Sequence, residues 1–159
     1  MPVTILCVGK QRESFYAAAA AEYQKRLTRL MPVTLIEIPD EREPENASPA
    51  LCDQALRKEG ERILSKIGQQ DYVIALCVDA KQPSSEELAE KIKALFVDGK
   101  SNITLVIGGS LGLSPQVLAR ANERMSMSRL TFPHQLARVV LLEQLYRVAK
   151  INAGERYHK

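Results

Sequence analysis

The sequence has few of the residues that build disulfide networks or metal sites. Among 159 residues there are only 3 cysteines and 2 histidines. Cys7, Cys52 and Cys77 form no Cys-x-x-Cys pair and are odd in number, which excludes a regular disulfide framework. Cys7 and Cys77 lie in apolar, strand-like runs and are predicted to be buried, reduced thiols of a cytosolic protein. His134 and His158 are too few and too far apart to indicate a metal site, so no bound metal is expected.

Long apolar runs and a large excess of one charge are also lacking. No apolar run approaches the roughly 18 residues that a membrane span requires. The N-terminal residues lead directly into a strand-like segment instead of a signal peptide, so we expect a cytoplasmic protein with no membrane partner. The formal net charge of +3 does not by itself indicate a nucleic-acid-binding protein, although it allows a local basic patch.

Length and composition are those of one self-sufficient domain. A chain of 159 residues is expected to form a single domain over residues 1–159. A chain of this size buries about 70% of its unfolded surface, so it folds without disulfides or a structural metal. The contents of 45% hydrophobic and 26% charged residues are typical of globular proteins.

Short apolar runs alternate along the chain with longer amphipathic segments. The predicted strands are Val3–Val8, Val33–Ile38, Tyr72–Val78, Ile103–Ile107 and Met125–Leu130. The predicted helices are Ser14–Leu30, with a cap at Ser14, and four that begin at Ser48-Pro49, at the capping box Ser84–Glu87, at Ser114-Pro115 and at Pro133. Residues 40–47 are charged and irregular. This alternation predicts an α/β fold with a mainly parallel sheet and helices on both faces.

A cluster of glycines follows the predicted strand Ile103–Ile107. It reads Gly108-Gly109-Ser110-Leu111-Gly112 and is called the glycine loop below. Ligands of parallel sheets bind at the carboxyl ends of strands, and glycines let a ligand approach the main chain closely. The loop is neither a dinucleotide fingerprint, which belongs after the first strand, nor a Walker A sequence. It therefore indicates either a ligand held by main-chain groups or a tight turn without a ligand.

The C-terminal segment begins with the turn Thr131–His134, which opens a long helix. On a helical wheel, Glu143, Arg147 and Lys150 form one polar stripe, and apolar residues cover most of the remaining circumference. Such a helix is either central in its domain or buried against another subunit, so a homodimer is a hypothesis. Taken alone, Glu143 and Arg147 are typical of a solvated i,i+4 pair.

Two features of this segment have two interpretations each. Arg138 falls in the most apolar arc of the helix, where its charge needs either a buried ion pair or a ligand. The chain ends on a tail, Gly154–Lys159, that contains Arg156, Tyr157, His158 and Lys159. Terminal residues are commonly solvated and frayed. Side chains of these types can also bind an anion, stack on a base and move a proton.

Several motifs, taken in order and at their spacings, resemble a known family. The sequence is similar to the small bacterial SPOUT methyltransferases that methylate N3 of pseudouridine in large-subunit (23S) ribosomal RNA, the RlmH family. The resemblance runs from Val3 to Lys159. It is carried by Leu35–Pro39, Lys58-Glu59-Gly60, Ile107–Ser114, Leu130–His134 with Arg138, Glu143–Arg147 and Tyr157-His158-Lys159.

The resemblance implies properties that residue patterns alone do not give. It implies one SPOUT methyltransferase domain with a C-terminal deep trefoil knot, S-adenosylmethionine as cofactor and a homodimer. It implies rRNA of the assembled ribosome as partner, since the chain has no separate RNA-binding domain. The cofactor-binding residues that it implies are Leu76, Gly108, Gly109, Met127, Ser128, Arg129, Leu130, Thr131 and Phe132.

The resemblance also suggests catalytic roles. His158 is the first candidate for handling the N3 proton, and Tyr157 for stacking on a flipped base. Arg138 and Arg147 are expected to stabilise negative charge or bind phosphate, and the tail of one subunit to complete the pocket of the other. Further phosphate contacts, or ordinary surface charges, are Lys10, Arg12, Arg156 and Lys159. The alternatives are a SPOUT methylase of another nucleoside and a non-catalytic ribosome-binding factor.

Overall fold

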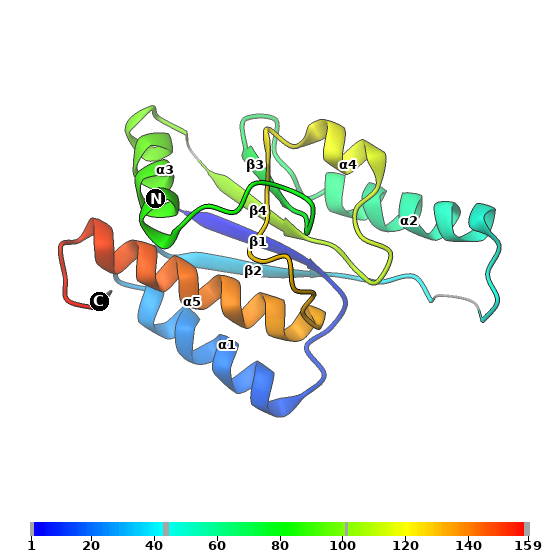
Figure 1. The fold of residues 1–159 in the computed structure, drawn as a ribbon, viewed down its shortest axis with the longest axis horizontal. Coiled ribbons are helices and arrows are strands. Elements are labelled where there is room, and N and C mark those ends of the chain that lie inside the picture. Colours follow the sequence, from blue (N-terminus) through cyan, green and yellow to red (C-terminus); the bar gives the residue numbers. More distant parts are fainter. Residues whose placement is uncertain (1, 43–44, 101, 158–159) are drawn as a thin grey trace.

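Parallel strands form the centre of the structure. The computed structural model describes residues 2–42, 45–100 and 102–157. Within these residues one sheet contains β1 (Val3–Val8), β2 (Val33–Ile38), β3 (Tyr72–Leu76), β4 (Ile103–Ile107) and β5 (Glu123–Met125). Its order is β2-β1-β4-β3-β5, and every pairing is parallel (Figure 1). The predicted α/β fold with a parallel sheet is confirmed.

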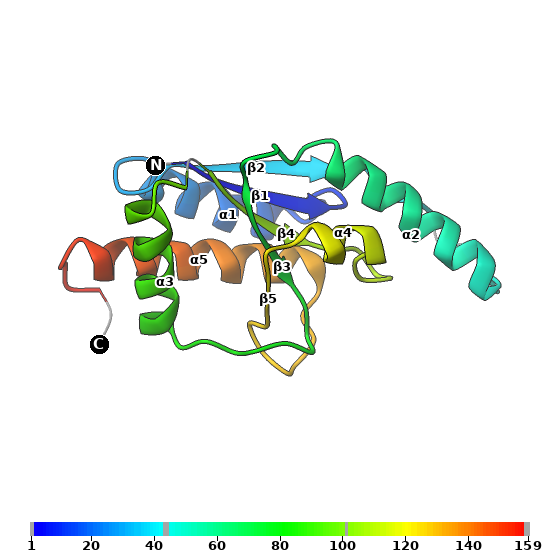
Figure 2. The same cartoon turned by 90° about the horizontal axis from the view of Figure 1, so that it is seen from above.

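Helices cover both faces of this sheet. They are α1 (Ser14–Leu27), α2 (Pro49–Leu64), α3 (Ser85–Val97), α4 (Pro115–Arg120) and α5 (His134–Asn152). The larger part of the core joins one face of the sheet to α1, α3 and α5. The smaller part joins the other face to α2 and α4 (Figures 1 and 2). Because both faces are covered, the three central strands β1, β3 and β4 are apolar along almost their whole length.

The helix starts that the sequence predicts are largely confirmed. Ser48 caps α2 and its hydroxyl accepts a hydrogen bond from Leu51 N at 3.3 Å. Ser84 and Glu87 form a complete capping box at α3. Ser114 caps α4 and accepts from Val117 N at 3.3 Å. Only α1 differs, because its cap position is Glu13 instead of Ser14. Serine hydroxyl caps thus fix the residues at which α2, α3 and α4 begin.

The predicted strand Met125–Leu130 is wrong. The strand at this place is β5, Glu123–Met125, and the chain turns away directly after it. Ser126 Oγ donates to the carbonyl of Ser128 at 3.0 Å, and the hydroxyl of Ser128 accepts from Leu130 N at 2.9 Å. Serine side chains that bond to nearby main-chain groups compete with a strand ladder. The apolar residues of this segment are therefore available to line a cavity.

Smaller differences concern element ends. The helix predicted over Ser14–Leu30 ends at Leu27, and the strand predicted over Tyr72–Val78 ends at Leu76. Boundaries of this kind depend on tertiary contacts that a periodicity does not contain. The early end of β3 matters for function because residues 77–79 become part of the loops at the carboxyl edge of the sheet.

The prediction of buried thiols is confirmed for Cys7 but is wrong for Cys77, which is only half-buried because it follows the end of β3. In the part of the chain that the structure describes, Cys7, Cys52 and Cys77 are all free. Cys7 is buried in β1, and burial raises the pKa of its thiol to about 11, so the thiol is protonated at neutral pH. None of the described helices is both long and apolar enough to cross a membrane.

Replacing a buried leucine of α5 tests how much the fold depends on this helix. Leu145 is completely buried, so we expect Leu145→Ala to lower the free energy of unfolding by about 2–5 kcal/mol. The control Leu51→Ala, in α2, removes the same atoms from a side chain that is 47% exposed and should change stability much less. Urea unfolding at one fixed protein concentration measures both. Equal losses for the two variants would show that α5 is not part of the core.

Candidate functional site

A cavity of about 430 Å³ opens at the carboxyl ends of β3 and β4. Its walls come from the end of each strand, from the glycine loop, from residues 127–132 and from the first turn of α5. The lining residues are Leu76, Cys77, Val78, Asp79, Ile107, Gly108, Gly109, Ser110, Gly112, Leu113, Leu118, Met127, Ser128, Leu130, Thr131, Phe132, His134 and Ala137. This is the place where parallel sheets bind small molecules.

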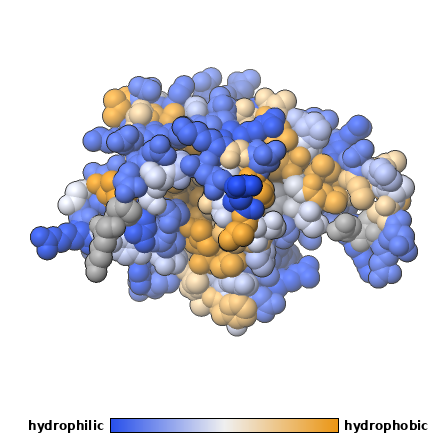
Figure 3. All heavy atoms as spheres, in the orientation of Figure 1, coloured by the Kyte–Doolittle hydropathy of each residue, from blue (hydrophilic) through white to orange (hydrophobic). Residues whose placement is uncertain are grey.

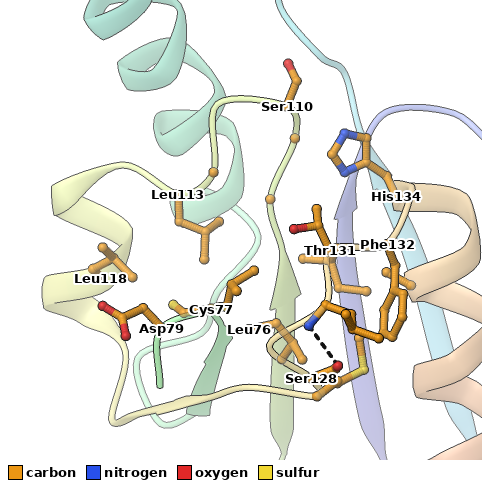
Figure 4. A pocket seen from close by; sticks show the side chains of 18 residues that line it. Leu76, Cys77, Asp79, Ser110, Leu113, Leu118, Ser128, Thr131, Phe132 and His134 are labelled. Atoms are coloured by element: carbon orange, nitrogen blue, oxygen red, sulfur yellow. Dashed lines mark hydrogen bonds between the residues drawn. The ribbon is translucent and has the colours of Figure 1, made fainter. Parts of the chain in front are cut away.

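The cavity is apolar on opposite sides. Figure 4 shows Leu113 and Leu118 on one side and Thr131 and Phe132 on the other, with Leu76 at the base. Leu130 is 73% exposed at its rim. Figure 3 shows apolar residues gathered near the middle of this face, over the segment that leads into α5. Apolar walls with a few main-chain polar groups are typical of a site for a small organic molecule.

The first two residues of the glycine loop leave little room for a side chain. A Cβ on Gly108 would lie 2.5 Å from the carbonyl oxygen of Gly112, and one on Gly109 would lie 3.0 Å from a methyl of Val8. Gly112 has a φ of +80° and donates its N–H to the carbonyl of Gly109 at 3.0 Å. Main chain thus packs against main chain. The turn itself requires these glycines, and the same glycines present bare main chain to the cavity.

Hydrogen bonds hold the opposite wall in place. Cys77 N donates to the carbonyl of Met125 at 2.8 Å, and Ser126 N donates to the carbonyl of Lys81 at 2.9 Å. The bond from Leu130 N to the hydroxyl of Ser128, dashed in Figure 4, fixes the turn that follows. The segment 126–130 is therefore fastened to the loop between β3 and α3, although about fifty residues separate the two in sequence.

The structure brings together almost all of the predicted cofactor residues. Of the set over Leu76, Gly108, Gly109 and residues 127–132, all but Arg129 line the cavity. Sequence reasoning missed Cys77, Val78 and Asp79, although residues directly after a strand are expected at this edge of the sheet. It also missed Leu113, Leu118 and Ala137, whose positions depend on how α4 and α5 pack.

Arg138 lies inside the protein. Its side chain is 1% exposed, and its two terminal nitrogens donate to Glu37 Oε1 and to the carbonyl of Gly9, each at 3.0 Å. Glu37 Oε1 also accepts from Gln11 N at 3.1 Å. The geometry therefore supports the ion pair among the two interpretations of this arginine. Arg138 joins α5 to the ends of β1 and β2, where it can position the cavity wall but is shielded from a large substrate.

The other predicted catalytic residues form a cluster at the far end of α5. Arg147 donates to Glu143 Oε1 at 2.7 Å and 3.1 Å, and the hydroxyl of Tyr157 donates to the same oxygen at 3.3 Å. The guanidinium of Arg147 lies 4.8 Å from the centre of the Tyr157 ring, and Tyr146 meets that ring edge-on at 4.8 Å. We call these four residues the tail cluster. Glu143 and Arg147 are thus more than the solvated pair that their spacing indicates.

Protonation of the tail cluster follows from its contacts. Burial, and next the charge of Glu143, raise the pKa of the Tyr157 hydroxyl, which is therefore protonated at neutral pH. Tyr157 can donate a hydrogen bond or stack, but it is not prepared to remove a proton. The predicted proton-handling residue His158 lies outside the described residues, as does Lys159.

The cavity and the tail cluster lie at opposite ends of one helix. His134, the first residue of α5, lines the cavity, whereas Arg147 lies thirteen residues further along. At a rise of 1.5 Å per residue this is roughly 20 Å. Figure 1 shows the last turn of α5 away from the loops at the carboxyl edge of the sheet. Within one chain, Arg147 and Tyr157 therefore lie away from the predicted cofactor residues.

Among the described residues, no group of three or more His, Cys, Asp or Glu side chains is arranged to hold a metal ion.

Comparisons with known proteins identify the family of this chain. A family model described as "Predicted SPOUT methyltransferase" matches residues 1–158. The chain is 55% identical to a "Ribosomal RNA large subunit methyltransferase H" of Clostridium novyi (strain NT). Proteins of the same name from Bifidobacterium adolescentis and Bacillus cytotoxicus are 52% and 51% identical. Each alignment covers 100% of this chain and 100% of the relative.

Exchanging arginine for lysine tests the buried ion pair. Lysine cannot reach both Glu37 and the carbonyl of Gly9, so we expect Arg138→Lys to lower the free energy of unfolding by about 1–3 kcal/mol. The control Arg26→Lys changes an i,i+4 pair with Glu22 whose side chains are 45% and 50% exposed, and it should leave the urea midpoint unchanged. An unchanged midpoint for Arg138→Lys would show that the buried geometry contributes nothing specific.

Proposed function

The chain belongs to the SPOUT methyltransferase family, and from this premise we propose that it methylates N3 of a pseudouridine in large-subunit ribosomal RNA. The proposed methyl donor is S-adenosylmethionine, and the proposed substrate is the assembled ribosome. The observation that carries the proposal is the cavity at the carboxyl ends of β3 and β4, which joins the glycine loop to residues 127–132. The deep trefoil knot implied by the family resemblance stays a prediction for this chain.

The cavity has the size and chemistry that the cofactor needs. Its volume of about 430 Å³ lies within the usual range of roughly 300–1,000 Å³ for small-molecule sites. Leu76, Leu130 and Phe132 offer apolar surface for an adenine ring, and the glycine loop offers main-chain donors and acceptors. When bound, S-adenosylmethionine supplies a methyl group that its sulfonium already activates. The protein has to align donor and acceptor, which contributes about 7–11 kcal/mol in favourable cases.

The acceptor nitrogen carries a proton that has to leave. A neutral imide nitrogen is a poor nucleophile, so a base within hydrogen-bonding reach, or cations beside the developing charge, are needed. We assign proton handling to His158 and charge stabilisation to Arg147. Tyr157, whose hydroxyl is protonated at neutral pH, would stack on the base or donate to one of its carbonyls. Arg138 would act by positioning the start of α5.

We propose that the complete site forms between two copies of the chain. The cavity and the tail cluster lie at opposite ends of α5. A twofold axis that crosses α5 would place the C-terminal end of one copy beside the N-terminal end of the other. Each dimer would then contain two sites, and each site would combine the cavity of one chain with the tail cluster of its partner.

The net charge bears on the substrate. With +3 on 159 residues, binding to free RNA is expected to be weak and strongly dependent on salt. Ribosomal surface around the target nucleotide would then supply much of the affinity. Weak binding to free RNA is also expected for the two alternatives, a SPOUT methylase of another nucleoside and a non-catalytic ribosome-binding factor. Only an analysis of the reaction product can therefore distinguish the three functions.

Methyl transfer to ribosomes tests the reaction directly. Labelled S-adenosylmethionine and the protein are added to ribosomes from cells that lack this enzyme, with and without prior pseudouridylation, and the labelled nucleoside is identified by mass. We expect N3-methylpseudouridine in large-subunit RNA only where pseudouridine is present. A different labelled nucleoside would favour the first alternative. Ribosome binding without cofactor binding would favour the second.

Heterodimers test the shared site. In the trans heterodimer one chain carries Gly108→Ala, which pushes a Cβ against the Gly112 carbonyl, and the other carries Tyr157→Ala. One of its two sites stays intact, so we expect about half of the wild-type activity. The control is a cis heterodimer, with both substitutions on one chain and none on the other, which should be almost inactive. If each site formed within one chain, the two results would be exchanged.

A further inference from the structure

The Lys58-Glu59-Gly60 motif lies directly behind the glycine loop and has no part in the reaction described above. Gly60 is the contact point of α2, because a Cβ there would lie 2.2 Å from the hydroxyl oxygen of Ser114. Ser114 in turn follows the glycine loop and caps α4. The helix that carries the motif therefore packs closely against the residue that caps α4, just after the end of the loop.

Glu59 is buried at this contact with one oxygen unpaired. Its side chain is 5% exposed, and its Oε2 accepts a hydrogen bond from Glu41 N at 2.9 Å. Its Oε1 has no hydrogen-bond partner among the described residues. This oxygen lies 3.4 Å from the position that a Cβ of Gly109 would occupy. A buried carboxylate oxygen without a partner is costly, and its persistence calls for an explanation.

The part of the glycine loop nearest to Glu59 limits which groups can donate a hydrogen bond to Glu59 Oε1. Gly109 has no side chain, so the loop meets Glu59 with main chain alone. An ionised carboxylate only accepts hydrogen bonds, and the groups of bare main chain that donate are its N–H groups. Gly109 also lines the cavity, together with Gly108. A ligand that bonds to the loop from the cavity side therefore acts on the main chain that faces Glu59.

We propose that Glu59 is a positioning residue for the cofactor loop, and that its Oε1 accepts a main-chain N–H of this loop when the cofactor fills the cavity. This inference rests on the proposed function, because it takes S-adenosylmethionine as the ligand. Glu59 then joins the segment after β2, through Glu41, to the glycine loop after β4. Binding of the cofactor and the arrangement of these two segments become coupled.

Binding of the cofactor is expected to change the protonation of Glu59. Burial raises the pKa of Glu59 above its usual value, against the bond from Glu41 N. Asp40 and the side chain of Glu41 also raise this pKa, whereas Arg62 lowers it. A new bond from an N–H favours the charged carboxylate and lowers the pKa when the cofactor binds. Binding then releases a proton, so affinity rises with pH up to the pKa of the free protein and is constant above it.

The test uses Glu59→Gln and its neighbour Glu61→Gln in the full-length protein. An amide oxygen can still accept from Glu41 N, but the NH₂ then faces the loop and cannot accept a hydrogen bond. We expect the dissociation constant for S-adenosylmethionine, measured by calorimetry above the pKa of Glu59, to rise at least about tenfold. The pH dependence of binding should disappear. Glu61 is exposed, so Glu61→Gln should bind as the wild type does at every pH.

A second measurement uses the wild-type protein alone and does not depend on how well a variant folds. Calorimetry in buffers of different ionisation enthalpy should show release of part of a proton on binding, only near the pKa of Glu59. Unchanged affinity and pH dependence in Glu59→Gln, or no proton release at any pH, would overturn the role of Glu59 while leaving the methyltransferase intact. Failure of the wild type to bind S-adenosylmethionine would instead overturn the proposed function together with this inference.

Discussion

The attachment of α5 to the sheet is the constraint on which the rest of the site depends. The guanidinium of Arg138 holds Glu37 of β2 and the carbonyl of Gly9, which follows β1. One turn earlier, the side-chain oxygen of Gln135 accepts from Arg12 N at 2.8 Å and from Glu13 N at 2.9 Å. These bonds fix the start of α5 over the ends of two strands and over the start of α1. Because His134 and Ala137 line the cavity, its outer wall is set by contacts that lie outside it.

The same helix separates two kinds of chemistry. Its N-terminal end contributes apolar and main-chain surface to a cavity that suits a small organic molecule. Its C-terminal end holds Glu143, Arg147 and Tyr157 in a compact arrangement of charge and aromatic rings, which suits a nucleotide. A rigid helix cannot bend these ends together. In the proposed dimer, two copies related by a twofold axis would bring the two ends together without any change of conformation.

Much of the fold follows from local sequence, whereas the site follows from contacts distant in sequence. Apolar runs predict four strands almost to the residue, and serine hydroxyls predict the starts of α2, α3 and α4 because capping is a local interaction. The apolar run after Met125 wrongly predicts a strand, because the serines of this segment bond to main-chain groups of their own turn. The partner of Arg138 could not be assigned, because Glu37 is 101 residues away. The cofactor residues came from a family resemblance, which carries the tertiary information that periodicity lacks.

The glycine loop shows how one short segment meets two demands. Gly108 cannot carry a Cβ because the carbonyl of Gly112 lies too close, and Gly60 of α2 cannot because the hydroxyl of Ser114 does. Steric exclusion therefore holds the loop between the cavity and α2, and few hydrogen bonds are needed to keep it there. Gly109 lines the cavity and also lies beside the unpaired Oε1 of Glu59, so its main chain can respond both to a ligand and to this carboxylate.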